Sequence, residues 1–225
     1  VQSGRIPPAR LEASVRKLLE AKLRLNLHRQ RFVSLEAIPD ELNSPEDQEL
    51  AAQAAQRAVA AVRNGNGLLP LKDPENACVF VLPPARSSTL GEAFAAALQQ
   101  MSPKTKVRTL TPQLAPSEIE DAARMASSCG TVVAAYAAYN AAYPGGAALA
   151  GDYPALIGRL METGAPLALA ALGNPYPLRH FPALPALATF STVTLSEEAA
   201  ARALLGRAPM SGRLPVSLPP PAPRE

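Results

Sequence analysis

The stretch ACVFVLPPARSSTLGEAFAAALQQ, residues 77–100, decides the fold class of this chain. Its first part, Ala77 to Leu82, is a continuous apolar run of the length and composition typical of a strand. Its second part, Ser88 to Gln100, has apolar residues at helical spacing. Strand followed by helix predicts one unit of an α/β domain with parallel strands.

The same order of strand and helix repeats along the rest of the chain. Four further strands are predicted, at Lys106 to Leu110, Thr131 to Tyr136, Pro166 to Leu172 and Ala186 to Phe190. Three further helices are predicted, at Ser117 to Ser127, Tyr153 to Thr163 and Ser196 to Leu205. The alternation indicates a layered α/β sandwich with a mostly parallel sheet of five to six strands. An extended piece, Gly212 to Leu218, is expected to add an edge strand.

Two connector helices are expected before the sandwich. Apolar residues between Arg10 and Leu27 recur mostly at spacings of three and four, and Asn26 is placed to end this helix in the left-handed conformation. Ser44 before Pro45 is a helix N-cap signal, which predicts a second helix to about Arg63.

The segment NGNGLLPLK, Asn64 to Lys72, joins the helical part to the first strand and fits neither periodicity. Its two Asn-Gly steps supply positions of positive φ, and Pro70 restricts the chain after a pair of leucines that must be buried. We therefore expect a loop that docks against another surface.

Composition excludes several classes of partner. A net charge of +3 and a pI near 9.0, without a polybasic block, do not imply a nucleic acid or an anionic membrane as partner. Only 4% of the residues are aromatic and tryptophan is absent, which disfavours an aromatic binding groove. No apolar run approaches the ~20 residues of a membrane span.

The sequence indicates no cofactor and no metal. Cys78 and Cys129 are the only cysteines and, with two scattered histidines, do not make a zinc site. Each lies beside an apolar run, so buried free thiols are favoured over a disulfide, and the cysteines do not decide the cellular compartment. The glycines of 146–151 are followed by Asp152 instead of the lysine of a phosphate loop. The GxG at 65–67 precedes a strand, whereas a dinucleotide fingerprint follows one.

Ligands of open α/β sheets gather at the carboxyl ends of strands, which directs attention to two loops. The loop after Tyr136 offers Tyr139, Asn140 and Tyr143, and the loop after Leu172 offers Asn174, Tyr176 and Arg179, as candidates for contacts to substrate or to another domain. The alternative is structural: a surface loop with packed tyrosines, and a turn in which Asn174 bonds nearby backbone. We expect no catalytic residue in either loop. His180 does not alter this expectation, because a lone histidine in a loop is more often a surface or packing residue.

Four segments in order resemble one known family: GRIPPARLEASVRKLLEAKLRLNL at 4–27, VRNGNGLLPL at 62–71, LGNPYPL at 172–178 and ALLGRAPMSGRLPVSLP at 203–219. Together they resemble family 3 glycoside hydrolases, in which a (β/α)8 barrel precedes an α/β-sandwich domain. The resemblance implies connector helices leaving an upstream barrel at 1–63, the sandwich domain at 64–218 and a proline-rich tail at 219–225. It also places the NGNGLLPL segment near the barrel.

The loop after Tyr136 has no glutamate, whereas the β-glucosidase branch of this family carries its acid/base glutamate in this region. Both the loop without a glutamate and the GNPY motif are similar to the β-N-acetylhexosaminidase branch. In that branch the barrel supplies the catalytic residues. The resemblance implies a non-catalytic second domain whose partners are the barrel and, through the whole enzyme, carbohydrate. A glycan- or partner-binding scaffold is the alternative. The branch implies export to the periplasm or the outside, with the cytoplasm as alternative.

Overall fold

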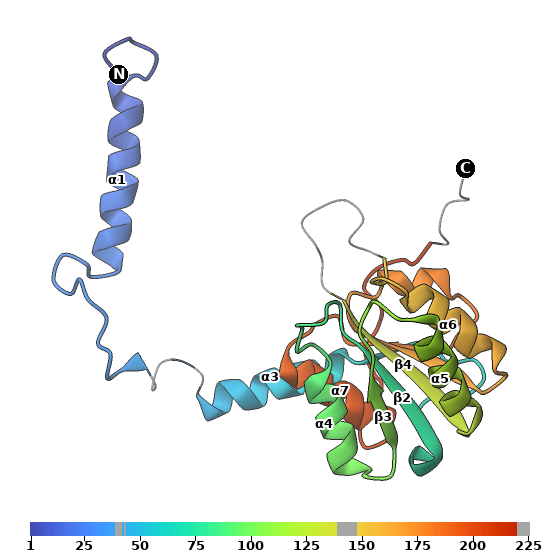
Figure 1. Ribbon diagram of the computed structural model, residues 1–225. Helices are drawn as coiled ribbons and strands as arrows, with labels where there is room; N and C mark the ends of the chain where they lie inside the picture. The colour runs from blue at the N-terminus through green and yellow to red at the C-terminus, as the bar shows by residue number, and fades with distance from the viewer. Residues whose placement is uncertain (39–41, 43, 139–147, 220–225) are drawn as a thin grey trace. The chain divides into compact units, whose positions relative to one another are not determined.

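Six strands form one sheet in the order β1-β6-β5-β4-β2-β3 in the computed structural model, which describes residues 1–38, 42, 44–138 and 148–219 (Figure 1). The strands are β1 (Ala60–Arg63), β2 (Ala77–Leu82), β3 (Lys106–Thr109), β4 (Thr131–Ala138), β5 (Leu167–Gly173) and β6 (Ala186–Ala188). All neighbours pair in parallel except β1 and β6, which are antiparallel. The predicted α/β sandwich with a mostly parallel sheet is confirmed.

The burial of the central strands explains why they could be predicted from the sequence. Every residue of β2 and β5 is buried, as is all of β4 except its first residue. Helices cover both faces of these strands, so their side chains need no polar alternation. β2 has the predicted bounds, and β4 continues two residues beyond Tyr136.

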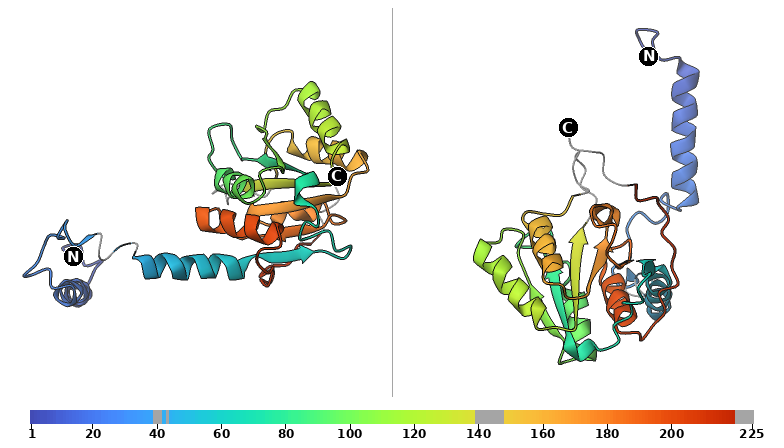
Figure 2. Two further views of the ribbon diagram at one scale, coloured as in Figure 1. Left: turned by 90° about the horizontal axis from the view of Figure 1, so that it is seen from below. Right: turned by 90° about the vertical axis from the view of Figure 1, so that its right-hand side faces the viewer.

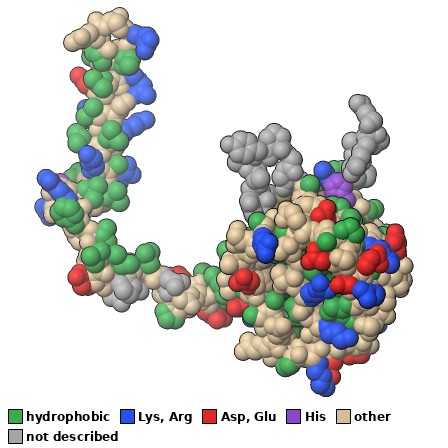
Figure 3. All heavy atoms as spheres, viewed as in Figure 1, with side chains coloured by type: hydrophobic (Ala, Val, Ile, Leu, Met, Phe, Trp, Pro, Cys, Tyr) green, Lys and Arg blue, Asp and Glu red, His purple; other side chains and the backbone are tan. Residues whose placement is uncertain are grey.

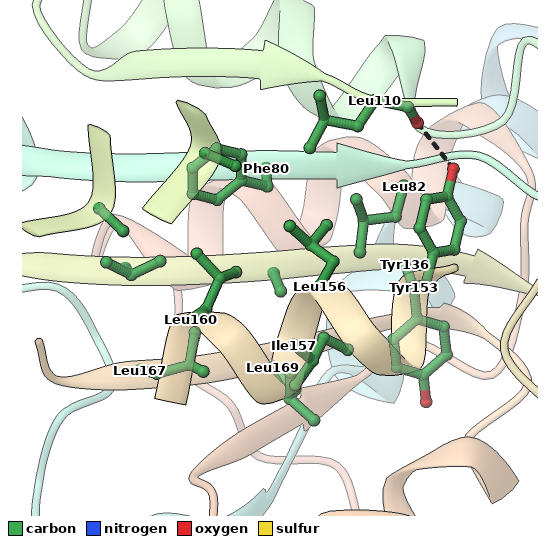
Figure 4. Packing of buried hydrophobic residues seen from close by; sticks show 14 of the residues in the cluster. Phe80, Leu82, Leu110, Tyr136, Tyr153, Leu156, Ile157, Leu160, Leu167 and Leu169 are labelled. Atoms are coloured by element: carbon green, nitrogen blue, oxygen red, sulfur yellow. Dashed lines mark hydrogen bonds between the residues drawn. The ribbon is translucent and has the colours of Figure 1, made fainter. Parts of the chain in front are cut away.

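Helices pack on both faces of the sheet (Figure 2). One face carries α4 (Glu92–Met101) and α7 (Thr194–Leu204), and the other carries α5 (Pro116–Ser127) and α6 (Tyr153–Glu162). Short 3-10 turns are η1 (Pro74–Asn76) and η2 (Tyr176–His180). On the second face, Leu156 and Leu160 of α6 pack over Phe80 and Leu169 of the sheet (Figure 4).

The first helix, α1 (Pro8–Arg24), ends as the sequence predicted. Asn26 has φ of 54°, and the N–H of Leu27 donates to the carbonyl of Lys22 at 3.0 Å, so the chain closes the helix with a left-handed residue.

Residues Val1–Gln48 and Glu49–Glu225 form two separate compact units. Among the described residues, no helix is long and apolar enough to cross a membrane.

The second connector helix, α3 (Pro45–Ala58), is shorter than predicted. Ser44 is its N-cap as expected, since its Oγ accepts the N–H of Asp47 at 3.1 Å. The prediction that the helix runs to Arg63 is wrong, because Ala60–Arg63 form the edge strand β1 beside β6. The backbone of a short alanine segment follows its tertiary partner here, against the helix propensity of alanine.

The junction segment docks on its own domain. The side chain of Asn64 pairs with the backbone of Leu69, accepting its N–H at 3.0 Å and donating to its carbonyl at 2.5 Å. Leu69 and Leu71 are buried in the core beneath α7, and the N–H of Leu71 donates to the carbonyl of Leu204 at 2.8 Å. The docking surface is thus the end of α7, and of the two glycines only Gly67 has positive φ, at 65°.

One further expectation, an edge strand at Gly212 to Leu218, is corrected. Residues Gly212 to Leu218 form no strand: the described contacts are one bridge between Ser211 and Ala60 and a hydrogen bond from the Gly212 N–H to the carbonyl of Val59. Pro215 has no N–H to give to a ladder, which limits pairing here. The tail at 220–225 lies outside the described residues.

The two cysteines are joined in a disulfide, so the predicted free thiols are wrong. Cys78 pairs with Val132 across β2 and β4, and Cys129 lies three residues before Val132. Parallel pairing therefore brings the two Cα atoms to 5.9 Å, although 51 residues separate them in sequence.

Candidate functional site

The strand order places the usual ligand crevice between β2 and β4. The chain proceeds from β2 to β3 on one side and then to β4 on the other, which is the switch point where open α/β sheets bind ligands at the carboxyl ends of their strands. In this chain Tyr153 of α6 lies beside that point. Its hydroxyl lies 2.8 Å from the carbonyl of Pro83 after β2 and 2.6 Å from that of Leu110 after β3.

Tyr153 has a structural role, filling this position with its side chain, and is not a reactive group. Its side chain is fully buried, and burial raises the pKa of its phenol, so the hydroxyl stays protonated and donates to these carbonyls. Figure 4 shows this hydroxyl and that of Tyr136 pointing in opposite directions. The position that often holds a cofactor is thus occupied by a side chain of the domain itself.

A hollow of about 380 Å³ opens instead at the carboxyl ends of β4 and β5. Its described walls come from the ends of these strands, the GNPY turn, the segment after β6 and the C-terminal segment: Ala138, Gly173, Asn174, Pro175, Tyr176, Phe190, Ser191, Thr192, Pro215 and Val216.

Gly173 allows the ends of β4 and β5 to lie close together at this hollow. Its φ is 108°, and a Cβ at this position would lie 2.2 Å from the carbonyl oxygen of Ala138 and 2.6 Å from Cγ2 of Thr192. The N–H of Gly173 donates to Oγ1 of buried Thr189 at 3.1 Å. Only glycine combines this backbone with such close neighbours.

Asn174 is a buried residue that lines the hollow. Its backbone N–H donates to the carbonyl of Ala138 at 2.8 Å, and its Oδ1 accepts the N–H of Tyr176 at 2.9 Å, which begins η2. Its carbonyl accepts the hydroxyl of buried Tyr136 at 3.3 Å, and burial raises the pKa of that phenol. This is the structural turn that the sequence left open as one alternative for Asn174.

The remaining predicted residues divide into three groups. Tyr176 lies at the hollow, half-buried. Arg179 is not among the described lining residues, and its Nε lies 3.4 Å from Nε2 of His180. Tyr139, Asn140 and Tyr143 lie outside the described residues.

Arg63 is a residue of this region that the sequence did not single out. From β1 its guanidinium donates to the carbonyls of Leu184 at 3.0 Å, Leu178 at 3.1 Å and Phe181 at 3.2 Å. Partial burial lowers the pKa of Arg63, and no carboxylate within hydrogen-bond reach neutralises its charge among the described residues. These carbonyls lie more than 100 residues further along the chain, so no local sequence signal marked this contact of Arg63.

The described lining of the hollow is polar and aromatic in part. Its described walls carry an amide, two aromatic rings and three hydroxyls, but no carboxylate or imidazole that would act as acid or base. Within the described residues no group of three His, Cys, Asp or Glu side chains is arranged to hold a metal.

Comparison with known proteins identifies the fold. No family model matches the chain. Over 99% of its length it superposes on 42% of a glycoside hydrolase family 3 β-N-acetylglucosaminidase from Paenibacillus, with a TM-score of 0.72 and 24% identity. A β-glucosidase of saponin metabolism from intestinal bacteria matches 97% of the chain with 39% of its own length, at a TM-score of 0.74 and 17% identity.

In sequence, 72 residues are 35% identical to a lysosomal β-glucosidase of Dictyostelium discoideum and cover 9% of that protein. The chain thus spans less than half the length of the solved relatives and a small part of this one. It has the fold of the carboxy-terminal α/β-sandwich domain of family 3 glycoside hydrolases, as the four sequence segments implied.

Proposed function

We propose that this chain is the non-catalytic second domain of a family 3 glycoside hydrolase, packing on a (β/α)8 barrel of the same protein and helping to shape the mouth of its site. The observation that carries the proposal is the coverage: nearly all of this chain corresponds to about two fifths of the Paenibacillus enzyme and of the intestinal β-glucosidase. The hollow, which has recognition groups but no described acid or base, fits a contributing surface.

The connector at 1–63 supplies a surface for the barrel. No residue of α1 is buried, yet it exposes Leu11, Val15, Leu18, Leu19 and Leu23, with Lys and Arg beside them (Figure 3). An apolar stripe of this length on a helix needs a partner. In the proposed protein the barrel covers this stripe, and the sandwich at 64–218 follows it, with 219–225 as a tail.

For the whole protein we propose retaining hydrolysis of terminal N-acetylhexosamine. Support comes from the missing glutamate after Tyr136 and from the GNPY turn, both of which resemble the β-N-acetylhexosaminidase branch. In that branch the barrel holds the nucleophile and the acid/base, so this chain contributes no catalytic residue. Asn174 and Tyr176 are then candidates for substrate or interdomain contacts, together with Tyr139, Asn140, Tyr143 and Arg179.

A glycan- or partner-binding scaffold without hydrolysis is the second candidate. The hollow favours it, because Tyr176 and Phe190 offer ring faces, and Ser191 and Thr192 offer hydroxyls, to a polar ligand.

We place the protein outside the cytoplasm, in the periplasm or beyond. The disulfide between Cys78 and Cys129 supports this, since such bonds persist in oxidising compartments. A cytoplasmic protein with the same fold is the alternative, and it would keep both thiols reduced.

The test compares this chain with the protein extended upstream to include the barrel, using an aryl N-acetylglucosaminide as substrate. We expect turnover by the extended protein and none by the chain alone. Hydrolysis by the chain at a rate near that of the extended protein would overturn the proposal. An extended protein that binds chitooligosaccharide without turnover would favour the scaffold.

The packing surface is tested by mixing the chain with a separately produced barrel. Leu18→Ser with Leu19→Ser should weaken their association at least tenfold in calorimetry. Lys17→Ser with Glu20→Ser, at charged positions of the same helix, is the matched control and should change it little. Equal effects of the two pairs would argue against the apolar stripe as the interface.

A further inference from the structure

The two Asn-Gly steps of the junction segment have a chemistry that the proposed function does not use. In such a step the backbone nitrogen of the glycine attacks Cγ of the asparagine, a C–N bond forms, and the side-chain nitrogen leaves as ammonia. Water then opens the succinimide ring to aspartate or isoaspartate, so no oxidant or other reagent is needed. Glycine hinders the attack least, because it has no side chain. Asn64-Gly65 and Asn66-Gly67 are thus the same reactive pair, two residues apart.

The structure holds Asn64 in an unreactive arrangement. Both ends of its amide are bonded to Leu69, with Oδ1 accepting the N–H at 3.0 Å and Nδ2 donating to the carbonyl at 2.5 Å. The side chain is also half-buried. For Cγ to meet the nitrogen of Gly65, both hydrogen bonds must break, and the backbone groups of Leu69 lose their partners.

Asn66 has a more reactive arrangement. It is exposed, and its Nδ2, the leaving nitrogen, makes no hydrogen bond to a described residue. Its Oδ1 accepts the N–H of Leu68 at 3.2 Å, so a donor already faces the oxygen on which negative charge develops during the attack.

One contact opposes the reaction at Asn66. The attacking nitrogen of Gly67 donates to the carbonyl of Asn64 at 3.0 Å and must leave that bond. This is a single turn bond at the exposed tip of the loop, whereas reaction at Asn64 breaks two bonds that are partly buried. The balance therefore favours Asn66.

We propose that Asn66 is a site of spontaneous covalent modification, converted to aspartate and isoaspartate in the folded protein, and that its pairing with Leu69 protects Asn64. Modification adds a negative charge at the loop tip. Isoaspartate also lengthens the backbone by one carbon, three residues before buried Leu69. We expect this insertion to loosen the attachment of the segment to α7.

The experiment ages the whole chain at pH 8 and 37 °C and maps it by tryptic digestion and fragmentation mass spectrometry. Cleavage after Arg63 and Lys72 releases both steps in one peptide, and an unaged sample sets the background. We expect Asn66 to be modified at least tenfold faster than Asn64 in the folded chain. Tenfold corresponds to about 1.4 kcal/mol, roughly one net hydrogen bond. In urea the two rates should agree within about threefold, because the dipeptide is the same.

Asn66→Gln is the matched variant, since glutamine forms the corresponding ring far more slowly, and it should remove the fast product while Asn64 stays slow. Equal rates in the folded chain, a faster Asn64, or no reaction at Asn66 while both react in urea would each overturn the proposal. Hydrogen exchange of the Leu71 amide should be at least fivefold faster in the aged chain. Unchanged exchange would refute the loosening.

Discussion

At the scale of single residues, Arg63 shows how β1 is held to the segment that follows the GNPY turn. One guanidinium donates to the carbonyl of Leu178 within η2 and to those of Phe181 and Leu184 after it, so β1 is bonded to η2 and to the segment that follows it. Arg63→Ala leaves these acceptors without their charged donor, and we expect the free energy of unfolding to fall by about 2–3 kcal/mol. Arg63→Lys should lose roughly half of this, because one ammonium group does not span three carbonyls.

Urea denaturation followed by circular dichroism measures both variants. Arg57→Ala, an exposed arginine of α3, is the reference substitution and should change stability by less than about 0.5 kcal/mol. If Arg63→Ala were no more harmful than Arg57→Ala, the clamp would have no energetic role.

Glu197 is the second residue that sequence reasoning did not anticipate. It is buried in α7, and its carboxylate accepts the N–H groups of Gly91 at 2.7 Å and Phe94 at 3.2 Å at the start of α4. Burial raises the pKa of this carboxyl above its ordinary value of 4.5 more strongly than these donors lower it, and nearby Glu92 raises it further.

The sign of the resulting pH dependence follows from the raised pKa. The folded chain takes up the proton of Glu197 at a higher pH than the unfolded chain, so this group lowers stability as pH rises from 4.5 through the folded-state pKa. We expect the stability of the native chain relative to Glu197→Gln to increase between pH 7.5 and pH 5. Urea unfolding at several pH values measures it. A constant or opposite difference would mean that hydrogen bonding outweighs burial here.

Sequence reasoning identified residues whose role is local. Asn26, Ser44 and Asn174 act on backbone within a few residues, so their types and neighbours sufficed to predict a helix end and a helix cap and to offer the turn as one of two alternatives. Arg63 and Glu197 act on partners more than 100 residues away, and no local pattern marks such contacts.

At the scale of elements, the buried strands and the edge strand β3 were predictable from the sequence, and the edge strand β1 was not. β2, β4 and β5 are read from apolar runs that need no partner to be recognised. β1 was read as helix because alanine favours helices, and its pairing with β6 lies far along the chain. The hollow was found in part: GNPY was singled out, whereas Phe190 and Val216 were read only as parts of strands, and nothing in the sequence brought them to the same place.

The disulfide joins two elements that are distant along the chain and whose proximity was not predicted. It connects β2 to the end of α5 across 51 residues, and closing a loop of this length stabilises a fold by about 2–4 kcal/mol. We therefore expect reduction to lower the free energy of unfolding by that amount in urea denaturation. The double variant Cys78→Ser with Cys129→Ser should be equally destabilised and insensitive to reductant.

Thiol titration in guanidinium without reductant gives an independent check. No reactive thiol should appear in the chain as isolated from an oxidising compartment. Two thiols per chain there would restore the prediction of free cysteines and remove the support for export.

At the scale of the whole molecule, α3 and β1, which the sequence assigned to the connector, contact α7 and the sheet. Ala55 and Val59 at the end of α3 pack on Ala199 and Ala203 of α7, and β1 completes the sheet. The sequence placed the start of the sandwich at residue 64, after these elements. A chain beginning there would lack an edge strand, the Arg63 clamp and the cover of α7.

We therefore predict that residues 44–225 fold alone with a cooperative urea transition, within about 1 kcal/mol of the full chain, because α1 has no buried residue to lose. Residues 64–225 should lose cooperativity or be less stable by at least about 3 kcal/mol, since burying Val59 and pairing β1 stabilise the sheet. Val59→Ser in the 44–225 chain separates packing from length and should destabilise it by about 2 kcal/mol or more. If the two truncated chains were equally stable, α3 and β1 would not stabilise the sandwich. They would then belong, with α1, to the surface that meets the barrel.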